Sequence, residues 1–316
     1  MSILKETFKL AIKNHQESKT NIAANLYKQV LKINPNYTLA HNNLGIIFKQ
    51  SDQINKAKDC FEKAIKTNPN YTLAHNNLGN IFKELREHQK AKDCFEKAIK
   101  TNPNYADAHN NLGIILKQLD QIQKAKNCFE KAIETNPNYA DAHNNLGIIF
   151  EELGEYQKAK NCFENVIKIN PNLADAHNNL GIIFKQLDQI HKAKNCYEKA
   201  IKANPNYAVA HNNLGIIFKE LGDHQKAKNC FEKAITINPN YVNAYYNLGA
   251  SQDKLKKFKE ATSAYKKVLD LDPLNKKNLL AYGKIMLKLN SHKIGLEYIQ
   301  KSTGVIKFKP TYYKII

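Results

Sequence analysis

A spacing of 34 residues runs through this chain and constrains its fold more than any other feature. Eight of the nine prolines recur at that interval, from Pro35 to Pro273, and only Pro310 is out of step. The segment His-Asn-Asn-Leu-Gly occurs six times, first at His41 and last at His211, and an altered seventh copy begins at Tyr245. A fixed period of this length predicts a stacked array of identical supersecondary units.

One unit, residues 106–139, contains two helical patterns when it is numbered from position 1 to position 34. Apolar residues in each half are spaced by three and four, which is typical of a helix with one packed face. Asp120 lies between the halves, where other units have Gly154 or Gly222, and such residues accept the left-handed conformation that ends a helix. Pro137 ends the second helix. Each unit is therefore expected to be a helix-turn-helix.

Position 8 of the unit is a glycine, Gly113, in the middle of the first helix. Glycine there is less stable than alanine by about 0.5–1 kcal/mol. Its recurrence needs an offsetting gain, and the simplest is close approach of the second helix at its small residues, Ala125 and Ala132.

These residues resemble the tetratricopeptide repeat family. The family's Leu-Gly pair corresponds to Leu112-Gly113, its aromatic residue at position 24 to Phe129, and its proline to Pro137. The main departure is His109 at position 4, where the family has tryptophan. The resemblance implies an all-α fold, a right-handed α-solenoid of tandem 34-residue helix-turn-helix repeats.

The resemblance divides the chain into four parts. Seven repeats are expected over residues 38–275, a degenerate capping repeat over 1–37, and a second degenerate cap over 276–303. Atypical end repeats are expected because an end repeat presents one face to water. Residues 304–316 form an apolar tail that either covers the last helices or leads to a partner or a further domain.

Composition narrows the function. The net charge of +19 comes almost entirely from lysine, with Arg86 as the only arginine, which counts against a nucleic-acid reader because such proteins favour the planar fork of arginine. Six cysteines are spaced by 34, too far apart in stacked repeats to pair, and free thiols fit the cytoplasm. No apolar run is long enough to span a membrane.

Neither a catalytic nor a metal site is expected. The chain has no glycine-rich phosphate loop and no nucleophile motif. Each repeat offers one histidine and one cysteine, which do not converge as the four ligands of a structural zinc site do. We therefore expect no enzyme activity, no cofactor and no metal. On the second helix, Glu62 precedes Lys66 by four residues, which predicts an ion-paired solvent face.

The candidate partner-binding residues share one face of the first helix. In the resembled family, positions 5, 6, 9 and 12 of that helix line a concave groove. Position 5 carries Asn42, Asn76, Asn110, Asn144, Asn178 and Asn212. Position 6 carries Asn43, Asn77, Asn111, Asn145, Asn179, Asn213 and Asn247. Position 12 carries Lys49, Lys83, Lys117, Lys185 and Lys219, interrupted by Glu151.

An asparagine amide offers a donor and an acceptor, which match the backbone of an extended peptide. The pattern resembles the repeat arm of O-GlcNAc transferases, where asparagines at position 6 hold substrate proteins. The leading hypothesis is a scaffold that holds an extended segment of a partner protein in this groove. One alternative is the substrate-docking arm of an enzyme such as a glycosyltransferase, with its catalytic domain elsewhere. Another is a weak anion or nucleic-acid binder that uses the lysine row.

Overall fold

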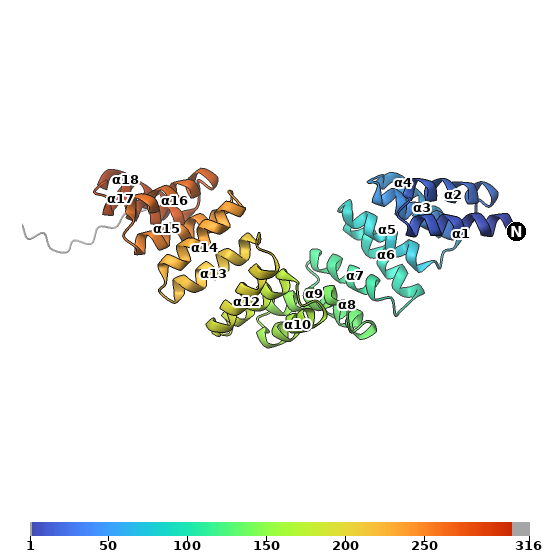
Figure 1. Ribbon diagram of the computed structural model, residues 1–316, viewed down its shortest axis with the longest axis horizontal. Coiled ribbons are helices and arrows are strands. Elements are labelled where there is room, and N and C mark those ends of the chain that lie inside the picture. Colours follow the sequence, from blue (N-terminus) through green and yellow to red (C-terminus); the bar gives the residue numbers. More distant parts are fainter. Residues whose placement is uncertain (1, 305–316) are drawn as a thin grey trace, which may run out of the picture. The chain divides into compact units, whose positions relative to one another are not determined.

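The computed structural model describes residues 2–304, and every regular element in that range is an α-helix (Figure 1). The first helices of the successive pairs are α1 (Ser2–Gln16), α3 (Thr38–Gln50), α5 (Thr72–Glu84), α7 (Ala106–Gln118), α9 (Ala140–Glu152), α11 (Ala174–Gln186), α13 (Ala208–Glu220), α15 (Val242–Lys254) and α17 (Lys276–Lys288). The second helices are α2 (Thr20–Ile33), α4 (Ile54–Thr67), α6 (His88–Thr101), α8 (Ile122–Thr135), α10 (Tyr156–Ile169), α12 (Ile190–Ala203), α14 (His224–Ile237), α16 (Phe258–Leu271) and α18 (His292–Thr303). The predicted all-α class and the helix-turn-helix pairing are confirmed.

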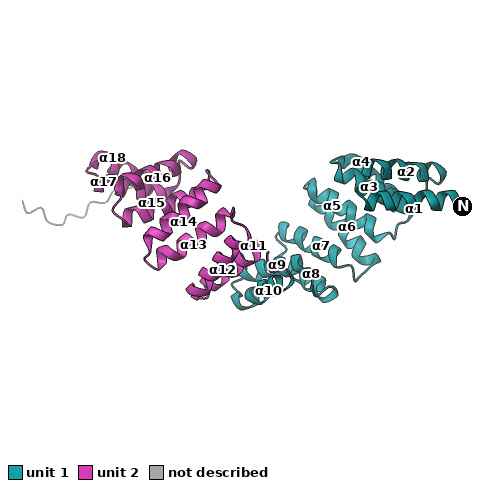
Figure 2. Ribbon diagram, in the orientation of Figure 1, with its two compact units in different colours: residues 1–169 teal, residues 170–316 magenta. Residues whose placement is uncertain are grey.

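The chain divides into two compact units, residues 1–169 and residues 170–316 (Figure 2). Unit 1 contains α1–α10 and unit 2 contains α11–α18. Within each unit, a helix packs mainly on the other helix of its pair and on the helix that follows. The predicted apolar tail lies outside the described residues, apart from Gly304, which ends α18 in the left-handed conformation with φ +75°.

The turn between the two helices of a repeat is the one that the sequence predicts. Asp120, Gly154 and Gly222 all have positive φ, of 58°, 73° and 80°. The residue after this position donates its backbone N–H back into the first helix, as Gln121 does to Leu116 O at 2.8 Å. At the other end of the pair, Asn136 is extended and accepts the backbone N–H of Asn138 on its side chain at 3.2 Å. Local chemistry therefore ends both helices.

Arg86 occupies the same left-handed turn position with φ 58°. A residue with a Cβ is disfavoured there, whereas glycine adopts this conformation without steric strain. We expect Arg86→Gly to raise the free energy of unfolding by up to about 1 kcal/mol, as measured by urea titration of helicity. Gly222→Arg, the reverse change at the same position of another repeat, should lower it, and equal effects of the two variants would contradict this account.

The mid-helix glycine approaches an aromatic ring and not the two alanines that the sequence suggested. A Cβ added to Gly113 would lie 2.6 Å from Cε1 of Phe129, and the ring of Phe129 is fully buried. The same contact with position 24 recurs at Gly45, Gly79, Gly147, Gly181, Gly215 and Gly249. The gain that offsets the weak helix propensity of glycine is therefore a buried ring packed on bare helix backbone.

Candidate functional site

The candidate groove residues lie on the first helices, which form the inner side of each stack. In unit 1, α3 contacts α5, α5 contacts α7 and α7 contacts α9, and in unit 2, α13 contacts α15 and α15 contacts α17. Second helices show no comparable contacts with one another among the described residues. The surface of the first helices is therefore the narrower side of each stack, which is the side expected to face a partner.

The asparagines of position 5 are not on an open surface, contrary to the expectation from helical spacing. Asn42, Asn76, Asn110, Asn178 and Asn212 are 2–5% exposed, and Asn144 is half-buried. Each buried amide accepts a hydrogen bond from the position-6 asparagine of the next repeat. The donors and acceptors are Asn77 to Asn42 (3.0 Å), Asn111 to Asn76 (3.1 Å), Asn145 to Asn110 (3.0 Å), Asn213 to Asn178 (3.0 Å) and Asn247 to Asn212 (3.2 Å).

We call this chain of amides the asparagine ladder. Each hydrogen bond, or rung, of the ladder joins two consecutive repeats. Both asparagines therefore stabilise the stack of repeats even when no partner protein is bound. A buried amide without a partner is destabilising by about 1–3 kcal/mol, which explains why asparagine recurs at both positions. Helical periodicity placed both positions on one face, but only the packing of one repeat on the next covers position 5.

The position-6 asparagines differ in whether the side-chain carbonyl oxygen is free to bind a ligand. The carbonyl oxygen of Asn111 accepts from Lys83 at 3.2 Å, and that of Asn247 accepts from Lys219 at 2.9 Å. Other position-6 carbonyls have no donor among the described residues, namely those of Asn77, Asn145 and Asn213. Each of these three amides keeps a carbonyl oxygen and one N–H for a ligand. The free amides occur in every second repeat.

The lysines of position 12 explain why free and occupied position-6 amides alternate along the chain. Lys49 pairs with Glu84 at 2.7 Å, Lys117 with Glu152 at 2.8 Å and Lys185 with Glu220 at 2.9 Å. These glutamates stand at position 13 of every second repeat, where the intervening repeats have glutamine. Lys83 and Lys219 find no glutamate in the next repeat and bind asparagine instead, and burial lowers the pKa of both.

The predicted lysine row is therefore largely satisfied within the protein. Its ammonium groups join successive repeats and do not form an open cationic surface. The alternation of Gln50 and Glu84 at position 13 was visible in the sequence and signals these pairs. The lysine row gives less support to a nucleic-acid partner than the net charge alone suggests.

The rest of the inner face is apolar and phenolic. The isoleucines of position 9, such as Ile114 and Ile148, are half-buried and form its floor. Tyr105 and Tyr139 lie beside Asp107, which is exposed. Burial, aided by that carboxylate, raises the pKa of Tyr105 to about 12 and raises that of Tyr139 further. Both phenols stay protonated at neutral pH and can donate hydrogen bonds.

The histidines of position 4 have a structural role that the sequence only partly indicated. Each ring packs in the repeat junction, and its Nε2 lies 2.8–3.0 Å from the carbonyl of the preceding repeat's proline, as His109 does from Pro103. A proline carbonyl only accepts, so Nε2 carries the proton. Over residues 2–304, no three His, Cys, Asp or Glu side chains gather in a way that could hold a metal ion.

The thiols should react slowly in the folded protein. Cys60, Cys94, Cys128, Cys162 and Cys230 are free, and burial raises the pKa of each to about 11. The thiolate is the reactive form, so its fraction at pH 7.5 falls by roughly two orders of magnitude relative to an ordinary thiol with a pKa of about 8.5. We expect alkylation by iodoacetamide to be correspondingly slower in buffer than in urea. Equal rates would contradict the burial.

Comparison with known proteins agrees with this architecture. The tetratricopeptide repeat model matches seven consecutive segments, 38–71, 72–105, 106–139, 140–173, 174–207, 208–241 and 242–275. No curated protein sequence was found to match this one. In the part of the chain that the structure describes, no helix is both long and apolar enough to cross a membrane.

Two solved structures share the fold. One, from a functional characterization of Pseudomonas aeruginosa pilF, is 22% identical with a TM-score of 0.56, and the alignment covers 61% of this chain and 88% of that one. The other, YrrB, described as a TPR protein with an unusual peptide-binding site, is 23% identical with a TM-score of 0.51 and covers 58% and 95%. The seven matched segments span most of this sequence, and the chain is therefore a member of the tetratricopeptide repeat family.

Proposed function

We infer that this protein is a non-catalytic scaffold whose first helices hold an extended segment of a partner protein. The observation that carries the proposal is the set of free amides on the inner face, at Asn77, Asn145 and Asn213. Each amide offers one acceptor and one donor, and an extended peptide backbone presents the complementary groups. The half-buried isoleucines beside them provide apolar contact for the partner's side chains.

Other features are consistent with this role. Tetratricopeptide repeats typically mediate protein–protein interaction, and YrrB, with the same fold, is described as having a peptide-binding site. The helix pairs within 1–37 and 276–303 would act as caps that present polar faces at the two ends. Free buried thiols fit a reducing compartment, so we place the protein in the cytoplasm.

The alternation of free and occupied amides provides a matched test. Asn145→Ala and Asn111→Ala each remove one rung of the asparagine ladder in unit 1, but only Asn145 has a free carbonyl oxygen. Asn213 and Asn247 form the same kind of pair in unit 2. We expect Asn145→Ala and Asn213→Ala to weaken partner binding about 2- to 12-fold each, the equivalent of a hydrogen bond of about 0.5–1.5 kcal/mol.

The measurement is calorimetric titration of a purified partner segment, first recovered by affinity capture with the intact chain. Asn111→Ala and Asn247→Ala are the controls and should bind within about twofold of the parent, because their amides are already occupied. If all four variants lose affinity equally, the effect is loss of stacking and not of peptide contact. If none does, the partner does not occupy the inner face.

A further inference from the structure

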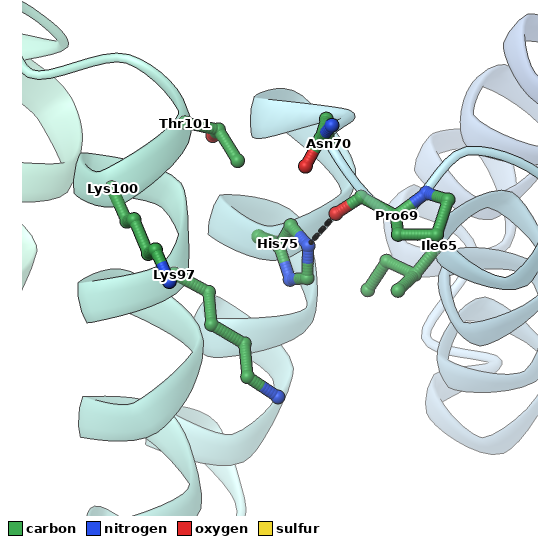
Figure 3. A pocket seen from close by; sticks show the side chains of 7 residues that line it. All are labelled: Ile65, Pro69, Asn70, His75, Lys97, Lys100 and Thr101. Atoms are coloured by element: carbon green, nitrogen blue, oxygen red, sulfur yellow. Dashed lines mark hydrogen bonds between the residues drawn. The ribbon is translucent and has the colours of Figure 1, made fainter.

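A second site lies away from the inner face, in a cavity of about 560 Å³ bounded by α4, α5 and α6 (Figure 3). Lys97 and Lys100 leave α6 on the side that faces α5. Opposite them are Pro69 and Asn70, in the turn after α4, and His75, at the start of α5. The two lysines belong to a second helix, which carries none of the inner-face residues. The cavity is therefore a separate candidate site.

Both ammonium groups in this cavity lack a carboxylate partner within the described residues. Asp93, one turn before Lys97, accepts a hydrogen bond from Gln89 at 2.8 Å. The sequence pattern predicted that Glu62 pairs with Lys66, four residues ahead, but Glu62 pairs with Lys58 at 3.8 Å. Glu96 likewise pairs with Lys92 at 3.6 Å and not with Lys100. The pocket consequently contains two uncompensated positive charges, one helical turn apart.

The equivalent pairs in the neighbouring repeats of unit 1 are only partly neutralised, because Lys66 makes no ion pair among the described residues. In the preceding repeat, Asp59 pairs with Lys63 at 2.7 Å. The residue one turn before Asp59 is Asn55, whose side chain is shorter than that of Gln89 and leaves the carboxylate to the lysine. In the following repeat, position 29 is Glu134, which pairs with Lys131 at 2.8 Å. The local sequence of this repeat thus leaves both lysines without a carboxylate partner, and the same holds among the described residues for Lys199 and Lys202, the equivalent pair in unit 2.

The other polar groups of the pocket define what can bind. The Thr101 hydroxyl donates its only proton to Ala98 O at 2.8 Å. It therefore accepts the hydrogen bond that it shares with the Thr72 hydroxyl, and it has no proton left to donate to a ligand. His75 is 5% exposed and is fixed by Pro69 O at 2.8 Å, with its buried Nδ1 unpartnered. The Asn70 side chain has no hydrogen-bond partner in the described structure and can donate. The groups that can donate to a ligand are the two lysine ammonium groups and the Asn70 amide.

We propose that this pocket binds a phosphorylated serine or threonine side chain of a protein segment. A phosphate monoester carries a charge of about −1.5 to −2 at pH 7 and three acceptor oxygens, so it compensates both lysines at once, whereas a carboxylate compensates one. Ile65 and Pro69 form an apolar wall beside the charges, which suits an aliphatic residue next to the phosphorylated one. The site acts independently of the inner face.

The test uses the intact chain and a synthetic peptide library with one fixed phosphoserine and varied flanking residues. The tightest phosphopeptide is titrated by fluorescence anisotropy at about 0.15 M salt, where long-range charge attraction is screened. We expect saturation at two peptides per chain, one at this pocket and one at the equivalent lysine pair, Lys199 and Lys202. Lys97→Gln with Lys100→Gln should weaken binding at this pocket at least about tenfold and lower the stoichiometry from two peptides to one. Lys32→Gln with Lys124→Gln, which removes the same charge from exposed positions, should leave binding unchanged.

A gain-of-function variant makes the test independent of damage to the pocket. Glu134→Lys places two lysines, at positions 131 and 134, beside Pro103, Asn104 and His109, and so repeats the same residue set one repeat later. It should raise the stoichiometry by one phosphopeptide per chain, from two to three. The proposal is overturned if the control pair weakens binding as much as the pocket pair. It is also overturned if the serine or glutamate form of the peptide, or adenosine monophosphate, binds as tightly, or if Glu134→Lys adds no site.

Discussion

Replacing Asn77, Asn111, Asn145 and Asn213 together with alanine lowers the free energy of unfolding by about 2–6 kcal/mol, since four hydrogen bonds of about 0.5–1.5 kcal/mol each are lost. Each change leaves the carbonyl oxygen of a buried asparagine in the preceding repeat without its donor. Urea titration monitored by circular dichroism measures the effect. The helical pattern alone predicts the opposite, because alanine is the better helix former at an exposed position.

The matched control is a fourfold alanine variant of Asn36, Asn104, Asn138 and Asn206, whose side chains are exposed and make no hydrogen bond in the described structure. It should change the unfolding free energy by less than about 0.5 kcal/mol per site. Because repeats interact mainly with their neighbours, both variants should be compared across the whole transition and not at its midpoint alone. Equal effects of the two variants would show that the asparagine ladder does not stabilise the stack.

Gly147→Leu is expected to lower the free energy of unfolding by about 3 kcal/mol, at the upper end for overpacking of a core. A Cβ at this position would already lie 2.9 Å from two carbons of the Phe163 ring and 3.1 Å from Cβ of Cys162. The ring is fully buried and cannot swing aside, so the two helices of the repeat must separate. Urea titration gives the loss of stability, and hydrogen exchange should locate it in α9 and α10.

Gly154→Leu, seven residues later in the same repeat, separates packing from backbone effects. A Cβ added there would meet nothing within 4 Å, but φ is +73°. Its destabilisation should be limited to about 1–2 kcal/mol, the strain of the left-handed conformation. If Gly147→Leu proves no worse than Gly154→Leu, the contact between glycine and ring is not what position 8 provides.

Sequence alone determined the features of this protein that depend on local chemistry. An Asn-Pro pair such as Asn136-Pro137 ends the second helix of a repeat, because proline cannot continue the helix and restricts the residue before it. Asp120 and Gly154 turn the chain because they tolerate positive φ. Repetition of these signals every 34 residues, with helical spacing between them, was sufficient to predict the helix pairs and their number over 38–275.

Only the tertiary structure decided which polar groups remain available to a partner. Asn110 and Asn145 look alike in the sequence, yet the first is 4% exposed and the second keeps half of its amide free. Lys117 and Lys83 occupy the same position, yet one pairs with Glu152 and the other with Asn111. Each of these contacts joins one repeat to the next across a helix interface. Periodicity within one helix assigns a residue to a face, but the packing of the next helix on that face determines what it covers.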